Sequence, residues 1–243
     1  MRRLFGAPQE VVVLMYHSVG QEDWEFTVTP ENFEKQIRYL KNRGYLFWDF
    51  RELKEFLTGR RNSIRQAVVV TFDDGYRDFV TNALPILRRY QIPALLLIHT
   101  DRSSYELGNQ YPLMSWDDIK KVASQGVKIG CHSHSHPNMK QLSDEQLRQE
   151  LEESAQMFRE HLGFAPTLFA YPGGKFNASV IQMLKESGYT LGFTIDRGLV
   201  HKGDNPFTLK RNGISAHTSL LEFKVRTSHA GEWYEHIVQL LKL

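Results

Sequence analysis

The sequence predicts an α/β fold in which parallel strands are covered by outer helices. Two observations lead to this prediction. Short apolar segments alternate with amphipathic segments from about residue 10 to residue 195, an order that implies parallel strand pairing with the helices outside. At 243 residues the chain is long enough to bury the core of one large domain, and it shows no internal repeat or inter-domain linker. We therefore expect residues 1–243 to form a single domain.

Six segments are expected to form buried strands, because each is short, apolar and rich in β-branched or aromatic residues. Several of them run directly into histidines or aspartates. In α/β folds the carboxyl ends of the strands carry the functional site, so these polar residues are site candidates. The strands are expected over residues 11–16, 68–72, 94–98, 127–131, 167–170 and 189–194.

The segments between the strands predict helices, and some carry clear end signals. Pro30 suits the first turn of a helix, and Ser143 with Gln146 forms a capping box. Pro85 is expected to bend or interrupt its helix. Helices are expected over 29–44, 50–58, 78–90, 115–126, 143–162, 177–186 and 231–243, and loops over 101–111 and 198–206.

The charge balance and the single cysteine exclude several classes of protein. The chain has 30 basic and 28 acidic residues, a net charge of +2, which gives no argument for binding nucleic acid or a membrane surface. No stretch of 18 apolar residues is present, so we expect no membrane span. Cys131 is the only cysteine, which rules out an intrachain disulfide. A lone cysteine at a strand end is more typical of the core than of a metal site.

The strand over 68–72 runs straight into Asp73, Asp74 and Gly75. Neighbouring residues on an extended chain point in opposite directions, so the two aspartates can serve one site only if the chain turns there. Gly75 allows such a turn at little steric cost. One carboxylate could then bind an ion while the other acts as a base. An isolated Asp-Asp-Gly is more often a polar turn, so this interpretation depends on the rest of the chain.

Three histidines, His132, His134 and His136, follow another expected strand. On a helix, His132 and His136 would share a face and could chelate one ion, whereas on an extended chain all three would share a face. Pro137 and the preceding strand favour extended or turning backbone over a helix. The spacing thus indicates a metal cluster without selecting its members, and three hydrated loop histidines remain the alternative.

Parallel strands bring their carboxyl ends to one rim, so candidates far apart in sequence are expected to converge. Histidine nitrogens with one carboxylate and an open water position form a catalytic zinc-type site. Such an ion acidifies water and polarises a carbonyl group. The candidates at strand ends are His17, Asp73, Asp74, His132, His134, His136 and the turn Tyr171, Pro172, Gly173 and Gly174.

The chain resembles the polysaccharide deacetylases of carbohydrate esterase family 4, which share the NodB homology domain. Thr71 to Gly75 matches the first motif of that family in full, and His132-Ser133-x-x-His136 matches its second motif. The resemblance implies a single distorted (β/α)7-type barrel of parallel strands with outer helices. It also implies that Asp73 is the general base and that Asp74, His132 and His136 bind the metal. His134 falls on a variable position of the motif.

The resemblance departs from the usual pattern at the third motif, where Ala170 stands in place of an arginine that orients the base. The Tyr171-Pro172-Gly173-Gly174 turn keeps the proline and the final glycine, and the oxyanion-binding N–H would fall on Gly173. The family's Asp-Trp motif is absent, and Ser215-Ala216-His217 is a poor match to the motif that carries the usual general acid.

These departures are similar to one branch, the deacetylases of poly-β-1,6-N-acetylglucosamine. Met15-Tyr16-His17 and the stretch from Phe169 to Gly174 match that branch, which implies that His17 is the general acid. The implied activity is metal-dependent hydrolysis of N-acetyl groups on an N-acetylglucosamine polysaccharide or oligosaccharide, with release of acetate. The implied cofactor is a divalent ion, with Zn²⁺ favoured and Co²⁺, Ni²⁺ or Fe²⁺ as alternatives.

Other interpretations stay open at this point. Related enzymes remove O-acetyl groups from xylan or act on chitin or peptidoglycan, and the missing arginine would also suit a weakly active glycan-binding module. The resemblance implies a place outside the cell or at its envelope. The apolar run after Arg2-Arg3 is too short and too interrupted for a signal peptide, so a cytoplasmic protein or one with its export segment removed is also compatible.

Overall fold

The structure is a computed structural model that describes residues 10–62, 65–101, 111–228 and 231. The helix expected over 231–243 and nearly all of the loop expected over 101–111 lie outside the described residues. Among the described residues, no helix combines the length and the apolar composition that crossing a membrane requires.

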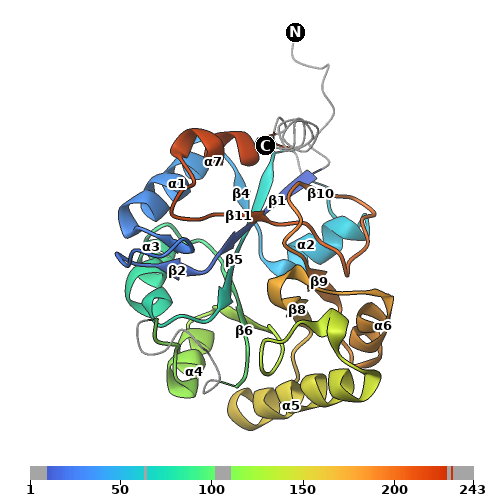
Figure 1. Cartoon of the computed structure of the whole chain (residues 1–243). Helices are drawn as coiled ribbons and strands as arrows, with labels where there is room; N and C mark the ends of the chain where they lie inside the picture. The colour runs from blue at the N-terminus through green and yellow to red at the C-terminus, as the bar shows by residue number, and fades with distance from the viewer. Residues whose placement is uncertain (1–9, 63–64, 102–110, 229–230, 232–243) are drawn as a thin grey trace.

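Six parallel strands form a curved sheet at the centre of the molecule, and helices surround it (Figure 1). All six strands were predicted from the sequence. Because their directions agree, their carboxyl ends lie at one rim. In the order of the sheet they are β1 (Glu10–Tyr16), β5 (Ala67–Asp74), β6 (Leu95–Ile98), β7 (Lys128–Cys131), β8 (Leu168–Ala170) and β9 (Leu191–Phe193).

Residues 209–213, here called the closing segment, connect the two edges of this sheet. Leu209 forms a parallel bridge with Phe193 of β9. A few residues later, β11 (Asn212–Gly213) pairs in parallel with β1. One short segment therefore contacts both the first and the last of the six strands. The predicted distorted barrel of parallel strands with outer helices is confirmed.

Several two-residue strands complete the architecture. β4 (Leu46–Phe47) pairs with the start of β5, and β2 (Ser18–Val19) pairs with β3 (Thr27–Val28) in a separate sheet. β10 (Val200–His201) runs antiparallel to the start of β1. The expectation of a loop over 198–206 was therefore wrong in part. A two-residue strand has no periodicity to detect, and backbone pairing with β1 alone defines it.

The helices follow the expected boundaries closely. Ser143 and Gln146 form the predicted capping box, and Gly163 ends the same helix with a φ of 80°. Pro85 lies in the first turn of α3, directly after a π-helical turn over Phe79–Ala83. The helices are α1 (Pro30–Asn42), α2 (Phe50–Leu57), α3 (Leu84–Arg89), α4 (Trp116–Ser124), α5 (Asp144–Leu162), α6 (Ala178–Glu186) and α7 (Leu220–Arg226), of which only α7 was not predicted.

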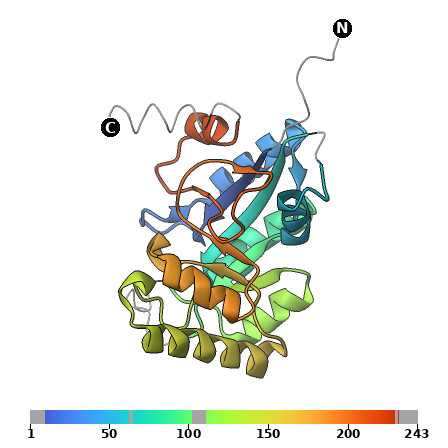
Figure 2. The same cartoon turned by 90° about the vertical axis from the view of Figure 1, so that its right-hand side faces the viewer.

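Alternation along β5 divides the core into two layers. Val68, Val70 and Phe72 belong to the core cluster that also contains the buried face of α1, whereas Ala67 and Val69 belong to the cluster that includes apolar residues of β6, β8 and β9. The period of two continues the second face to Thr71 and Asp73. A strand that is apolar for most of its length thus carries polar side chains at its carboxyl end. Figure 2 shows the same barrel from the side, with α5 and α6 packed together below it.

Candidate active site and metal centre

The carboxyl ends of the strands open onto a pocket of about 450 Å³. Most of the predicted site residues lie in its walls, although they come from different strands. Pro172 is buried and lies outside the pocket lining, as does His134. The predicted residues that line the pocket are His17, Asp73, Asp74, His132, His136, Tyr171 and Gly173.

β5 ends in a tight turn that lets two adjacent carboxylates serve one pocket. Asp74 has a φ of 67° and Gly75 a φ of 79°, and the Gly75 N–H donates a hydrogen bond to the Asp73 carbonyl at 2.8 Å. The positive φ reverses the direction that alternation would give to Asp74. The turn therefore begins at Asp74, one residue before the glycine that the sequence suggested.

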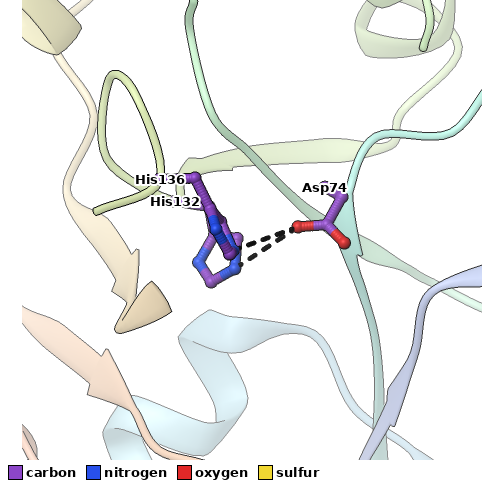
Figure 3. A group of neighbouring side chains, drawn as sticks. All are labelled: Asp74, His132 and His136. Atoms are coloured by element: carbon purple, nitrogen blue, oxygen red, sulfur yellow. Dashed lines mark ion pairs between the residues drawn. The ribbon is translucent and has the colours of Figure 1, made fainter. Parts of the chain in front are cut away.

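The histidine segment after β7 is neither a helix nor a strand. Ser133 and His136 both have positive φ values, 70° and 60°, and the His136 N–H donates to Ser133 Oγ at 3.0 Å. This folded loop directs two imidazoles toward Asp74 (Figure 3). Asp74 Oδ1 lies 3.5 Å from His132 Nε2 and 3.6 Å from His136 Nε2.

His134 and Cys131 take no part in this group. His134 Nδ1 lies 2.8 Å from Thr100 Oγ1, and its Nε2 lies 3.4 Å from a carboxylate oxygen of Glu153. The Cys131 side chain is fully buried, and burial raises the pKa of its thiol to about 11. Cys131 is therefore an ordinary core residue, as expected.

The donor atoms of Asp74, His132 and His136 fit a divalent metal ion. One ligand atom from each residue lies within 4.8 Å of the other two. His132 Nδ1 is 2.9 Å from the Ala170 carbonyl, which can only accept, so Nδ1 carries the proton and Nε2 keeps its lone pair toward Asp74. Burial lowers the pKa of His132 to about 4, which keeps the imidazole neutral at pH 7. Two imidazole nitrogens and a carboxylate are ligands of a catalytic metal site.

Glu150 on α5 holds the histidine loop in shape from outside the barrel. Its Oε1 accepts hydrogen bonds from the backbone N–H groups of His134 and Ser135, at 2.8 and 2.5 Å. The Ser135 hydroxyl donates to Glu150 Oε2 at 3.1 Å. The Glu150 residue is only 8% exposed. One buried carboxylate thus satisfies three donors between the two imidazoles and restrains their separation.

Arg211 in the closing segment holds the Asp73 carboxylate with a two-pronged salt bridge. Its Nη1 and Nη2 donate to Asp73 Oδ1 and Oδ2, both at 2.7 Å. Its Nε donates to the Thr194 carbonyl at 2.9 Å, and Nη1 also lies 3.2 Å from Thr71 Oγ1. Arg211 is completely buried and Asp73 is 2% exposed. The arginine that the sequence lacks at Ala170 is thus replaced by one from the closing segment.

This salt bridge sets the protonation state of Asp73. Burial by itself would raise the pKa of the carboxyl, but the charge of Arg211 and the hydrogen bonds from Arg211 lower it to about 2. Asp73 is therefore ionised at neutral pH, and a fixed guanidinium compensates its charge. The carboxylate is oriented and negatively charged before any ligand enters.

His17 follows β1 and lines the same pocket. Its charge lowers the pKa of Asp73 and of Asp74, against the effect of burial, which raises both. Within the described part of the chain, the buried Nδ1 of His17 has no hydrogen-bond partner, and its ring packs 4.8 Å from the Phe26 ring. By contrast, His217 is exposed and lies outside the pocket lining.

The turn after β8 needs glycine for two different reasons. Gly173 and Gly174 have φ values of 54° and 66°, which favour glycine. A Cβ on Gly174 would also lie 2.4 Å from Ile195 Cγ1. Gly173 has no such neighbour and lines the pocket, so its backbone forms part of the wall.

The aromatic side chains near the pocket are partly buried in the core and partly exposed. Tyr171 is fully buried, donates its hydroxyl to the Phe207 carbonyl at 2.9 Å and stacks on Phe176, so it shapes the wall without offering a free hydroxyl. Tyr76 is 2% exposed and likewise belongs to the core. The aromatic rings with exposed surface in the pocket are instead Trp24 and Phe26.

Sequence reasoning missed Arg211, Glu150, Trp24 and Phe26. The absence of an arginine at Ala170 signalled that a partner for Asp73 must come from elsewhere, but nothing marked Arg211 among the other arginines. Glu150 had a weak signal, since it is a carboxylate among the buried positions of α5. The two aromatic residues lie in a polar segment with no periodicity.

We expect Arg211→Gln to lower the free energy of unfolding by about 3 kcal/mol at pH 7, because Asp73 would stay buried without its cation. The loss should be smaller at pH 3. Wild-type Asp73 stabilises the fold above its ordinary pKa of 3.8 and loses that effect as the pH falls through about 2, whereas the unpaired carboxyl of the variant can take up a proton. Denaturant unfolding at both pH values measures this, with exposed Lys210→Gln as the control. Equal unfolding free energies of the two variants at pH 7 would contradict it.

We expect Glu150→Met to weaken zinc binding roughly tenfold or more, since partners that hold metal ligands in place typically contribute that much. Met has no acceptor for the loop N–H groups, whereas Glu150→Gln keeps one carbonyl oxygen and should lie between Met and wild type. Titration against a competing chelator measures the affinity. The exposed neighbour Glu152 provides the control variant Glu152→Met. If Glu150→Met and Glu152→Met bind zinc equally well, Glu150 does not position the loop.

Comparisons with known sequences identify related proteins. The sequence pattern of the family named Polysaccharide deacetylase matches residues 60–192, more than half of the chain. YxkH of Bacillus subtilis, a candidate polysaccharide deacetylase by name, is 26% identical over 208 residues, covering 86% of this chain and 72% of that protein. The poly-beta-1,6-N-acetyl-D-glucosamine N-deacetylase of Staphylococcus aureus is 25% identical over 213 residues, covering 83% and 72%.

Solved structures show the same fold. The deacetylase PplD of Streptococcus pyogenes in complex with acetate superposes with a TM-score of 0.81, at 24% identity and covering 91% of this chain and all of that one. IcaB from Ammonifex degensii gives a TM-score of 0.80, at 24% identity and covering 93% and 98%. With the match of the family pattern over residues that include Asp73, Asp74, His132 and His136, the chain belongs to the polysaccharide deacetylase family.

Proposed function

We propose that this protein is a metal-dependent N-deacetylase that removes acetyl groups from an N-acetylglucosamine polysaccharide and releases acetate. The observation that carries the proposal is the arrangement of two carboxylates with different partners in one pocket. Asp73 is paired with Arg211, whereas Asp74 faces His132 and His136. One carboxylate is thereby available as a base and the other as a ligand.

Asp74, His132 and His136 would hold the metal ion, with Zn²⁺ favoured by the mixed nitrogen and oxygen donors and Co²⁺, Ni²⁺ or Fe²⁺ as alternatives. Bound there, a divalent ion would polarise the acetamide carbonyl and lower the pKa of water. The neutral state of His132 suits ligation without the loss of a proton at pH 7.

Asp73 accepts the proton of the attacking water, whose oxygen bonds to the acetamide carbon. Its low pKa means that it is already deprotonated when the substrate arrives. Negative charge then develops on the carbonyl oxygen, and the Gly173 N–H would donate to it, a role supported by the position of Gly173 in the pocket lining. Arg211 acts through Asp73, because it fixes both carboxylate oxygens. Tyr171 and Pro172 hold the turn that presents Gly173.

His17 donates a proton to the sugar nitrogen as the carbon–nitrogen bond breaks. The electron pair of that bond stays on nitrogen, so the products are acetate and a free glucosamine amine. His17 lies in the same pocket as Asp73 and Asp74, and an imidazolium is a suitable proton donor. The base and the acid are therefore different residues with different environments.

The substrate class rests on two observations about this chain. The S. aureus relative is named for poly-β-1,6-N-acetylglucosamine, and Met15-Tyr16-His17 with Phe169 to Gly174 matches that branch. A panel of acetylated polymers tests the choice. If xylan, chitin or peptidoglycan releases more acetate than the β-1,6-linked polymer, the polymer with the greatest release is the substrate instead.

The same geometry argues against a weakly active glycan-binding module. That alternative depended on the missing arginine, and Arg211 now holds the base by two hydrogen bonds. We also infer that the chain works as a single catalytic domain, because the pocket draws on residues from Met15 to Arg226.

We expect Asp73→Asn to reduce acetate release at least a hundredfold, the usual loss when a general base is removed, while zinc still binds to its three ligands. Exhaustive chelation of wild type should also abolish release, and added Zn²⁺ or Co²⁺ should restore it. Exposed Asp117→Asn serves as the control. Full activity after chelation would refute the metal dependence, and full activity of Asp73→Asn would refute its role as base.

We expect His17→Gln to lose far more activity on an N-acetylated oligosaccharide than on 4-nitrophenyl acetate. The amine is a poor leaving group that needs a proton, whereas nitrophenolate leaves without one. The loss on the oligosaccharide should be on the order of a hundredfold. Asp73→Asn should impair both substrates, and exposed His217→Gln neither. An equal loss on both substrates in His17→Gln would show that His17 is not the acid.

A further inference from the structure

Trp24 lies at the side of the pocket where His17 is found, on the segment between β2 and β3. Phe26 links the two rings: its centroid is 4.8 Å from that of His17 and 5.1 Å from that of Trp24. Both aromatic residues line the pocket, Phe26 is 37% exposed and Trp24 is partly exposed. An apolar surface open to solvent beside a catalytic pocket indicates a ligand that covers it.

The Trp24 ring is fixed by its neighbours. The rings of Tyr76 and Phe26 meet it edge to face, at 5.3 and 5.1 Å with interplanar angles of 74° and 71°, and the Tyr111 ring lies at 4.6 Å with an angle of 36°. Its backbone is also held, because the Trp24 N–H donates to Glu22 and its carbonyl accepts from Thr27, both at 2.9 Å. The indole is therefore a rigid surface.

The segment that carries Trp24 is anchored to the helical turn after β5. Ser18 Oγ donates to Asp78 Oδ2 and accepts from Thr27 Oγ1 at 3.0 Å, and Asn82 Nδ2 donates to the Val19 carbonyl at 2.7 Å. The segment that carries Trp24 and the Asp73–Asp74 turn are thus attached to the same end of β5. The Trp24 surface is therefore preorganised, so little conformational entropy is lost when a ligand binds to it.

We propose that Trp24 is a sugar-stacking subsite that binds the pyranose ring next to the one being deacetylated. The inference rests on the proposed function. The Phe26 ring packs against the rings of both His17 and Trp24, so a sugar ring that covers Trp24 would lie beside the one whose acetamide nitrogen His17 protonates. The C–H face of a pyranose is apolar and packs on an indole, whereas its hydroxyls stay in water. The subsite therefore favours a polymer over a single sugar.

The experiment compares acetate release from a β-1,6-linked N-acetylglucosamine pentasaccharide and from the N-acetylglucosamine monosaccharide. In Trp24→Leu the ratio of the two kcat/KM values should fall about tenfold, the loss expected for one aromatic contact, and Trp24→Phe should retain most of it. Trp116→Leu is the matched control, because Trp116 is also partly exposed within an aromatic cluster but lies outside the pocket lining.

A second measurement does not depend on turnover. The Asp73→Asn protein should change its tryptophan fluorescence when the pentasaccharide binds, and Asp73→Asn with Trp24→Phe should lose that change although three other tryptophans remain in the chain. An unchanged pentasaccharide-to-monosaccharide ratio in a folded Trp24→Leu, or equal losses on both substrates, would overturn the subsite. If Trp24→Leu does not unfold cooperatively, the fluorescence of Asp73→Asn with Trp24→Phe tests the subsite instead, and a fluorescence change as large as that of Asp73→Asn alone would overturn it. Absence of acetate release by wild type from every substrate would instead refute the proposed function.

Discussion

The salt bridge between Arg211 and Asp73 is the interaction on which the rest of the site depends. Two charged groups that are 0% and 2% exposed are stable only as a pair with further hydrogen bonds, and Thr194 and Thr71 provide these. The pair joins the closing segment to β5, and the backbone of the same segment bridges β9 and β1. Barrel closure and the orientation of the Asp73 carboxylate are therefore one structural event.

Backbone conformation then separates the roles of two neighbouring carboxylates. The left-handed φ of Asp74 directs its oxygen to His132 and His136, while Asp73 stays with Arg211. Without that turn, alternation would place one of the two outside the barrel. The imidazoles depend in turn on a loop that Glu150 restrains from α5. Side chains from the inside and the outside of the barrel thus fix the same three donor atoms.

The pocket combines these polar side chains with an aromatic wall. Trp24 and Phe26 form the wall beside His17, on a segment that hydrogen bonds attach to the turn after β5. A long acetylated glycan needs both features, a polar centre for the acetamide and an apolar surface for the neighbouring ring. The family match, the site geometry and the proposed subsite are consistent with one class of substrate, although Trp24 lies outside the residues that the family pattern matches.

The sequence by itself determined the six central strands, most of the helices and the candidates at the strand ends. Hydrophobic periodicity and capping are local signals, so Ser143 with Gln146, or the strand that ends at Asp73 and Asp74, could be recognised without contacts. It left open which histidines act together, because that depends on the positive φ of Ser133 and His136. Only the tertiary structure decided the partner of Asp73, since Arg211 is 138 residues away in a segment without strand periodicity. A contact between residues this far apart in sequence leaves no local pattern near either of them. The pair becomes buried only when the closing segment pairs with the strands at both edges of the sheet.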